Sequence, residues 1–242
     1  METRTIEING EKIEVTTRED KNEGILFNII LVNQCFSLLR LSRAQQLLSY
    51  YLYSTQIGWV PLIIDLGANV GFSSLYFSAT WPLSQVCAVE PEDNNYQLLK
   101  KHTASKRNIN PFCNAISNEQ ERVSIANPET NSPVSFIVKP DMNGEISTIT
   151  VQNLLDQYPK SKKFLPFIIK IDIEGYENKL FSSNTEWIDQ FPVIIIEPHD
   201  WMLPSSANFS TFIKAIADKD RDFVIIGENI FSIQNNLSIP IT

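Results

Sequence analysis

The chain has 242 residues, 43% of them apolar, and a formal net charge of -8 at pH 7. This length and apolar share suit one globular domain with additions, and the negative charge argues against non-specific nucleic-acid binding, which needs a basic surface. An odd number of widely spaced cysteines argues against a disulfide framework or a zinc site and favours buried thiols in a reducing compartment. These cysteines are Cys35, Cys87 and Cys113.

The N-terminal segment carries no sign of export or membrane insertion. Residues 1–5 are polar and lack the apolar core of a signal peptide. The most apolar early stretch, residues 25–41, is interrupted by polar side chains and is too short to span a bilayer. We therefore expect a cytoplasmic protein without a membrane span.

The first sixty residues predict a hairpin followed by helix. Two alternating runs, 6–8 and 13–15, flank Asn9-Gly10, a strong signal for a tight hairpin turn. Apolar residues then recur at helical spacing over 27–53, which predicts one long helix, or two, packed outside the sheet. The tyrosines at the end of this segment, Tyr50, Tyr51 and Tyr53, could border a pocket, but core packing is the favoured interpretation.

From residue 62 onward, predicted strands alternate with helices. The first strands are expected at 62–66, 85–89 and 111–116, with helices at 72–79 and 93–106 between them. This βαβαβ order predicts a parallel sheet with right-handed crossovers. The later elements are a small inserted hairpin at 122–126 and 134–138, a helix over 148–158 capped near Thr150, buried strands at 167–171 and 193–196, helices from 177 and over 208–217, and closing strands at 223–226 and 230–233.

A glycine loop follows the first of these buried strands. The strand ends in Asp65, and Gly67-x-Asn69-x-Gly71 opens the next helix. Glycines there let the backbone approach a ligand beyond the carboxyl end of the strand. The next strand ends in Glu90, whose carboxylate can accept hydrogen bonds from both hydroxyls of a ribose. The glycine fingerprint of dinucleotide-binding proteins is one residue longer than this loop and has Gly in place of Asn69. A simpler alternative to a ligand-binding loop is a turn that needs its glycines only for packing.

A second concentration of charge lies in Lys170-Ile171-Asp172-Ile173-Glu174-Gly175-Tyr176-Glu177. Strand alternation places Lys170 and Asp172 on the same side. The three carboxylates must face solvent, a cation or each other, because burying them unpaired is costly. A solvated loop with Glu177 at a helix N-terminus is the competing interpretation.

Together, in this order, the motifs resemble the FkbM family of S-adenosylmethionine-dependent methyltransferases. The resemblance covers roughly residues 61–197, and Lys170–Glu177 is its most specific part. Asn114-Ala115-Ile116-Ser117 and the segment 149–155 support it. It implies a class I methyltransferase fold, a Rossmann-like, doubly wound, mostly parallel seven-stranded sheet over 59–242, preceded by the extension 1–58 within one compact unit.

The resemblance also implies a cofactor, S-adenosylmethionine, with S-adenosylhomocysteine as product, bound at the carboxyl edge of the sheet. The residues implied in binding are Asp65, Gly67, Ala68, Asn69 and Gly71 on the methionine side, Glu90 and Pro91 at the ribose, Asn114 and Ala115 near the adenine, and Asp172 near the transferred methyl group.

An alcohol acceptor must lose its proton, which requires a base within hydrogen-bond reach. The candidates at this edge are Asp172, Glu174 and His199, with Lys170 beside them as a fourth catalytic candidate. The ordinary pKa of a histidine, about 6.5, suits a base, although a surface histidine in a loop is an equally good interpretation of His199.

Two further expectations concern the role of His102 and a possible metal site. We expect His102, which lies among lysines on a predicted helix, to be structural or solvated. Asp172, Glu174 and Glu197 could supply oxygen ligands for Mg²⁺ or Ca²⁺, but their spacing is not diagnostic, and we expect no metal.

The sequence thus predicts an O-methyltransferase that acts on a hydroxyl of a small molecule or sugar, in glycan or natural-product tailoring. An NAD-dependent oxidoreductase is one alternative. Another is a non-catalytic scaffold that binds a partner through the N-terminal hairpin and helix. The oligomeric state stays open, with a homodimer across the hairpin as one option.

Overall fold

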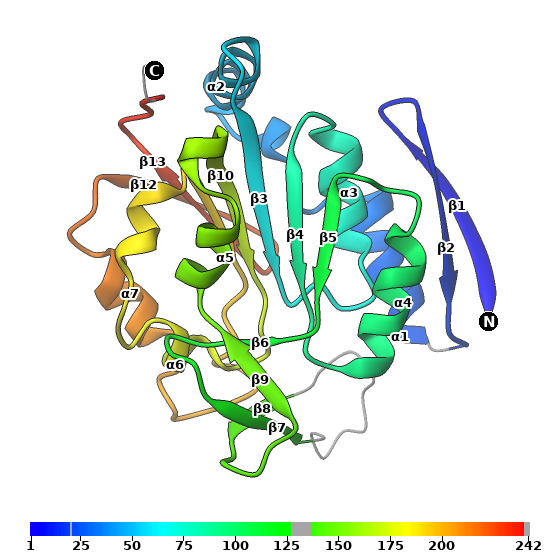
Figure 1. Ribbon diagram of the computed structural model, residues 1–242, viewed down its shortest axis with the longest axis vertical. Helices are drawn as coiled ribbons and strands as arrows, with labels where there is room; N and C mark the ends of the chain where they lie inside the picture. Colours follow the sequence, from blue (N-terminus) through cyan, green and yellow to red (C-terminus); the bar gives the residue numbers. More distant parts are fainter. Residues whose placement is uncertain (20, 127–136, 240–242) are drawn as a thin grey trace.

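The computed structural model describes residues 1–19, 21–126 and 137–239, and its centre is a large mixed sheet (Figure 1). In the described ranges this sheet has seven strands in the order β12-β13-β11-β10-β3-β4-β5. Their bounds are β3 Val60–Leu66, β4 Gln85–Val89, β5 Ile109–Phe112, β10 Phe164–Ile171, β11 Val193–Ile196, β12 Arg221–Ile226 and β13 Asn229–Gln234.

The strands from β5 to β11 pair in parallel, as the alternating sequence predicts, while β13 runs antiparallel to both β11 and β12. The α/β class is therefore confirmed, and the sheet is mixed. Because β3 lies between β4 and β10, the loops that follow these three strands open at one edge.

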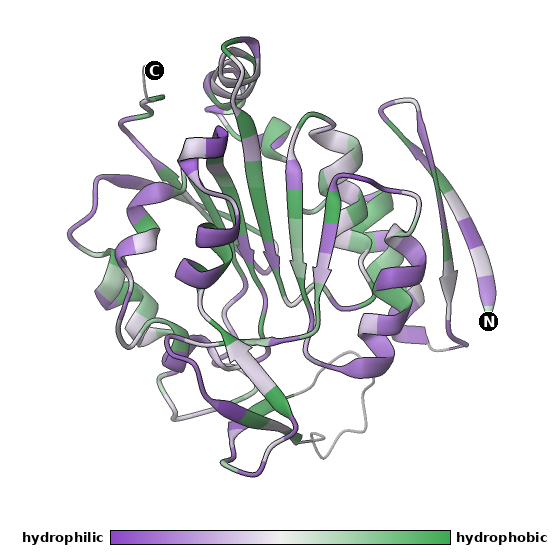
Figure 2. Ribbon diagram, viewed as in Figure 1, coloured by the Kyte–Doolittle hydropathy of each residue, from purple (hydrophilic) through white to green (hydrophobic). Residues whose placement is uncertain are grey.

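Helices cover both faces of the sheet (Figure 1). One face packs against α1 Lys21–Phe27, α2 Ala44–Gln56, α3 Phe72–Thr80 and α4 Asp93–Thr103, and the other against α5 Val151–Gln157, α6 Glu177–Leu180 and α7 Ser210–Ile216. Along β3, Ile63 belongs to the first core, whereas Leu62 and Ile64 belong to the second. A strand buried on both faces needs an uninterrupted apolar run, and Figure 2 shows the central strands as the most hydrophobic part of the molecule.

The N-terminal hairpin is confirmed. Its strands β1 Glu2–Ile8 and β2 Glu11–Thr17 pair antiparallel. Asn9 and Gly10 have φ angles of 50° and 79°, as a two-residue turn that matches the strand twist requires. The amide of Asn9 donates to the carbonyl of Ala79 on α3, so the hairpin rests on the helical layer.

Of the two alternatives predicted for 27–53, one long helix is wrong, and two separate helical segments are closer to the structure. After α1 the chain forms a π-helical turn, η1 Asn28–Val32, then a 3-10 turn, η2 Leu38–Arg40, before α2. Gln34 adopts a φ of 51°, and a left-handed residue ends a helix. Tyr50 stacks on Phe167 in the core and Tyr51 packs tilted against the same ring. Their packing role is confirmed, whereas that of Tyr53 is wrong, because its side chain is exposed.

A small second sheet carries β6 Ala115–Ile116, β9 Ile146–Ile149, β7 Arg122–Ala126 and β8 Ile137–Pro140, in that order. The antiparallel β7–β8 pair confirms the inserted hairpin, although residues 134–136 of its predicted second strand lie outside the described ranges. The predicted strand 111–116 is divided, because the amide of Asn114 donates to the carbonyl of Ser147 and the chain passes from the large sheet to the small one.

The sequence predicts three buried cysteines, but only one of them is buried. Cys87 is buried, but Cys35 is half-buried and Cys113 is exposed, since Cys113 lies at the crossing between the two sheets. No helix within the described ranges is both long and apolar enough to cross a bilayer.

Candidate active site

A cleft of about 840 Å³, including its open mouth, lies at the carboxyl edge of β3, β4 and β10. Its lining includes many of the residues singled out from the sequence, namely Gly67, Ala68, Asn69, Glu90, Pro91, Asn114, Ala115, Lys170, Asp172 and Glu174.

The glycines of the loop after β3 are required by the packing of the protein itself. Gly67 has a φ of 75°, and a Cβ there would lie 1.7 Å from the carbonyl oxygen of Asp172. A Cβ on Gly71 would lie 2.7 Å from the Leu99 side chain on α4. Gly71 is outside the cleft lining, so its contribution is to seat α3 against α4, and the loop between the two glycines faces the cleft.

Asp65 lies behind this loop, outside the cleft lining. It is the register partner of Lys170 on the neighbouring strand β10. Its Oδ2 accepts hydrogen bonds from the hydroxyls of Ser73 and Ser74, both at 2.6 Å, and its Oδ1 is 3.3 Å from the ammonium of Lys170. The contacts of Asp65 are thus with α3 and β10, and it supports the loop from beneath.

Glu90 forms part of the cleft wall and is buried. Its Oε2 accepts from the backbone N–H of Asn69 at 2.8 Å, and its Oε1 accepts from that of Glu92 at 2.9 Å. Burial raises the pKa of Glu90 to about 7, although these two hydrogen bonds act to lower it. Each carboxylate oxygen can accept a further hydrogen bond, so Glu90 is ready to receive two ligand hydroxyls.

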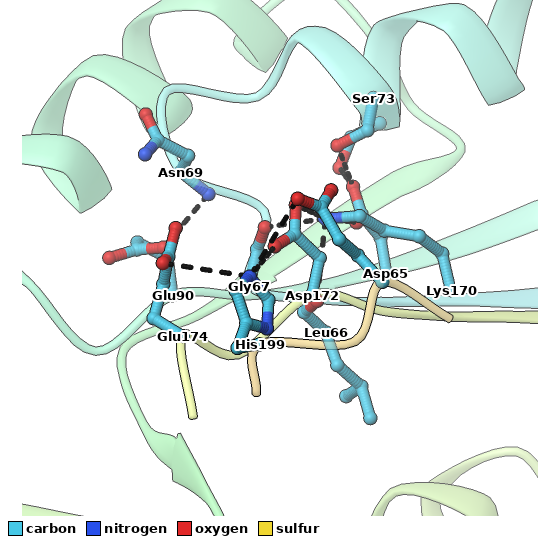
Figure 3. Close-up of polar contacts among 12 residues, drawn as sticks. Asp65, Leu66, Gly67, Asn69, Ser73, Glu90, Lys170, Asp172, Glu174 and His199 are labelled. Atoms are coloured by element: carbon cyan, nitrogen blue, oxygen red, sulfur yellow. Dashed lines mark hydrogen bonds and ion pairs between the residues drawn. The ribbon is translucent and has the colours of Figure 1, made fainter. Parts of the chain in front are cut away.

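Lys170 is a fixed, buried cation (Figure 3). Its ammonium donates to the carbonyl of Gly67 at 2.7 Å and lies 3.3 Å from the carboxylates of both Asp65 and Asp172. Burial acts to lower the pKa of Lys170, but the charges of Asp172 and Asp65 outweigh it and raise the pKa above its ordinary value. The ammonium therefore holds Asp172 and the glycine loop in place.

His199, in the loop after β11, is only 1% exposed, so the interpretation as a surface histidine is wrong. Its Nδ1 is 2.7 Å from Oε1 of Glu177, which is fully buried and also accepts a hydrogen bond from Asn208. Its Nε2 faces three carboxylate oxygens, of Asp172 at 3.5 Å, Glu174 at 3.6 Å and Glu197 at 3.8 Å.

The groups around His199 have strongly perturbed pKa values. Burial acts to lower the pKa of His199, but the hydrogen bond with Glu177 and the charge of Asp172 raise it to about 9. Burial and the charge of Asp172 raise the pKa of Glu174 to about 8 and that of Glu197 to about 7. Such values are typical of functional sites.

The loop after β10 holds Glu174 in an uncommon backbone conformation. Its φ is 53°, and Gly175, which follows, has a φ of 93°. A Cβ on Gly175 would lie 2.6 Å from the Leu203 side chain. A left-handed conformation costs a residue with a side chain free energy, and here it turns the Glu174 carboxylate toward the cleft and His199 (Figure 3).

Sequence reasoning missed several residues of the cleft. Leu26 of α1 and Ile30 of η1 line it, as do Asn95 of α4 and Tyr176. The apolar spacing of Leu26 and Ile30 predicts a helix but does not show which surface that helix covers. His102, expected to be structural or solvated, is buried and bonded to the carbonyl of Val70, so its structural role is confirmed.

Comparison with known proteins agrees with this geometry. The model of the methyltransferase FkbM domain matches residues 65–224. A curated relative, the hexuronic acid methyltransferase AglP of Haloferax volcanii, is 24% identical over 169 residues, which are 66% of this chain and 68% of AglP.

Solved structures with a similar chain course include two methyltransferase-type proteins. A precorrin-6y C5,15-methyltransferase from Geobacter metallireducens is 10% identical, with a TM-score of 0.42 over 76% of this chain and 84% of that one. The fibrillarin of Aeropyrum pernix, solved with bound S-adenosyl-L-methionine, is 11% identical, with a TM-score of 0.43 over 77% and 74%. The domain match, in contrast, spans more than half of the chain and includes both the glycine loop and the Lys170–Glu177 segment, so the protein belongs to the FkbM family of methyltransferases.

Proposed function

We propose that this protein is an S-adenosylmethionine-dependent O-methyltransferase that acts on a hydroxyl of a sugar or another small molecule. The observation that carries the proposal is one cleft with Glu90 on its wall and the carboxylates of Asp172 and Glu174 in its lining. The relative AglP is named for a hexuronic acid, which supports a sugar as the acceptor class.

The residues present fit the cofactor. The buried carboxylate of Glu90 has acceptor capacity for two ribose hydroxyls, and Asn114 and Ala115 lie farther along the same cleft. S-Adenosylmethionine supplies, when bound, a methyl group on a positively charged sulfur. The carboxylate of Asp172 in the lining gives the cleft a negative group that complements such a cation.

The cluster around His199 would remove the proton of the acceptor hydroxyl. Glu174 and Glu197, with pKa values raised to about 8 and about 7, have the basicity that a general base needs near neutral pH. Because these groups face the same imidazole nitrogen, they titrate together, and the proton belongs to the cluster and not to one residue. Lys170, 3.3 Å from its carboxylate, holds Asp172 in place.

The first test is a calorimetric titration of the full-length protein with S-adenosylhomocysteine, with NAD as the control. Binding of the first ligand alone is expected. Binding of NAD alone would favour the oxidoreductase, and silence from both ligands would favour the scaffold; either result contradicts the proposal.

The second test fixes the methylated atom. Labelled methyl transfer is measured with a set of hexuronic acids and neutral hexoses as acceptors, and the products are treated with alkali. A methyl ether resists alkali, whereas a methyl ester releases methanol. We expect an alkali-stable product, because a carboxylate acceptor needs no base and would leave the cluster around His199 without a use. An alkali-labile product would contradict the hydroxyl assignment.

A further inference from the structure

Three potential metal ligands converge beside the cleft. One ligand atom from each of Asp172, Glu174 and His199 can be chosen so that all three lie within 4.8 Å of one another. Asp172 and Glu174 follow β10, and His199 follows β11, its parallel neighbour. The sheet therefore fixes the relative position of the two loops that carry the ligands (Figure 3).

The imidazole of His199 is oriented as in a metal ligand. Its Nδ1 hydrogen-bonds the fully buried Glu177, and a carboxylate on the far nitrogen is how proteins orient histidines that bind metals. Its Nε2 has no hydrogen-bond partner within the described part of the chain; it faces Asp172 and Glu174 at 3.5 and 3.6 Å. This side chain is only 1% exposed, and its second nitrogen points at the carboxylates.

The cluster also has an excess of negative groups. Lys170 is shared between Asp65 and Asp172, and one face of His199 is taken by Glu177. Glu174 and Glu197 are then left to share Nε2 of His199 with Asp172.

We propose that Asp172, Glu174 and His199 bind one divalent cation of the Mg²⁺ and Mn²⁺ class at the inner end of the cleft. Two carboxylates with one imidazole suit such an ion, and Glu197, 3.8 Å from Nε2, is placed for a contact through water. The role of the ion, though not its binding, rests on the proposed function: it would hold the acceptor hydroxyl and lower its pKa. The proposal departs from the sequence-based expectation of no metal.

The test uses Mn²⁺ as the probe on full-length protein that has been stripped with a chelator. Free Mn²⁺ is measured by electron paramagnetic resonance at pH 8, with and without S-adenosylhomocysteine. We expect one ion per chain, and a dissociation constant at least about tenfold higher in Glu174→Gln and in His199→Gln, since even outer partners of a metal site change affinity by 10–100-fold. Glu7→Gln, which removes an exposed carboxylate from β1, is the matched control and should bind like the wild type.

A second measurement detects the nitrogen ligand directly. The bound Mn²⁺ of the wild type should show electron spin-echo modulation from one imidazole nitrogen, and this signal should disappear in His199→Gln. Bound ion without nitrogen modulation, or affinity unchanged in both variants, would overturn the site.

The outcomes separate this inference from the proposed function. If S-adenosylhomocysteine binds and Mn²⁺ does not, the metal site is wrong, the proposed function stands, and a protonated His199 is what balances the carboxylates. If Mn²⁺ binds with the expected signature and S-adenosylhomocysteine does not, the metal site stands and the proposed function is wrong.

Discussion

Glu90 accepts its two backbone hydrogen bonds through different oxygens, which leaves each oxygen one further site for a ligand. We expect Glu90→Ala to weaken S-adenosylhomocysteine binding by about 1.5–3 kcal/mol, the usual contribution of hydrogen bonds to a charged group. Calorimetry measures the change, with Asp93→Ala, an exposed carboxylate three residues along, as the control. Equal affinities of wild type and Glu90→Ala would remove Glu90 from the cofactor site.

The same carboxylate predicts a pH dependence of binding. The pKa of Glu90 in the free protein is raised to about 7, and the charged form is the better acceptor. Affinity for S-adenosylhomocysteine should therefore fall as pH decreases from 8 to 6, whereas Glu90→Gln, which cannot titrate, should lack this component. Parallel profiles for the two proteins would contradict the assignment.

Asp172 joins two parts of the site, because one oxygen pairs with Lys170 and the other faces His199. Asp172→Asn keeps the size of the side chain and removes its charge. We expect retained S-adenosylhomocysteine binding and a turnover lower by about 10²-fold or more, the scale of a positioned acid–base group. Single-turnover kinetics measure the loss, with the exposed Asp156→Asn as the control. Unchanged turnover would exclude Asp172 from the chemistry.

Single residues show what the sequence could and could not predict. Glu90 and Asp172 were found because each ends a strand, and strand ends meet at one edge of a parallel sheet. The burial of His199 was not predictable, because its partner Glu177 is 22 residues away and the two meet only through the pairing of β10 with β11. The pairing of β10 with β3 determines the lysine contact of Asp65.

At the scale of elements, the loop from β3 to α3 depends on the closeness of β10. We expect Gly67→Ala to be far more destabilising than Gly227→Ala, although both glycines have positive φ angles, 75° and 61°. A Cβ on Gly227 meets nothing within 4 Å and should cost only the conformational strain, about 1–2 kcal/mol. Chemical denaturation gives both free energies of unfolding. Similar losses would show that the loop can move away from Asp172.

Elements with strong periodicity were predicted well, and β4, β7 and β11 were predicted at their observed bounds. The capping box at Thr150 was also signalled locally, and its hydroxyl accepts from Asn153. The break after η1 was not signalled locally. Apolar residues recur at helical spacing on both sides of Asn33 and Gln34, and only tertiary packing decides that the chain turns there. β9 was missed for a related reason: its four residues form a strand only through β6 and β7.

At the scale of the whole molecule, His102 joins three parts of the chain. Its Nδ1 donates to the carbonyl of Val70 in the glycine loop, and its Nε2 accepts from the backbone N–H of Thr16 in the hairpin. Burial lowers the pKa of His102, so the neutral imidazole is the stabilising form. Unfolded chains take up a proton below about pH 6.5 and the folded protein does so less readily; stability from His102 is therefore full above pH 6.5 and is lost as pH falls.

The pH dependence of stability due to His102 can be measured by comparing the wild type with a variant. The free energy of unfolding should decrease more between pH 7.5 and 5.5 in the wild type than in His102→Gln, whose amide does not titrate. The pKa values of Glu174 and Glu197 are raised, so their contribution to the free energy of unfolding changes with pH in the opposite direction. The difference between the two proteins cancels that contribution. An identical pH dependence would show that His102 titrates as it does in the unfolded chain.

We also propose that the extension 1–58 and the domain 59–242 unfold as one unit. Contacts from the hairpin reach α3 and α4 through Asn9 and Thr16. Calorimetry should show one transition whose van't Hoff and calorimetric enthalpies agree. Two separate transitions would mean that the extension is an independent body.

Leu26 and Ile30 form part of the cleft wall but lie outside the segment that matches the family model. The segment that defines the family begins at residue 65, yet these two side chains line the same cleft as Glu90 and Asp172. Substitutions or insertions before residue 58 can therefore reshape the cavity without touching any residue by which the family is recognised. We expect substitutions at Leu26 and Ile30 to change which ligands the cleft accepts while the segment that matches the family model stays the same.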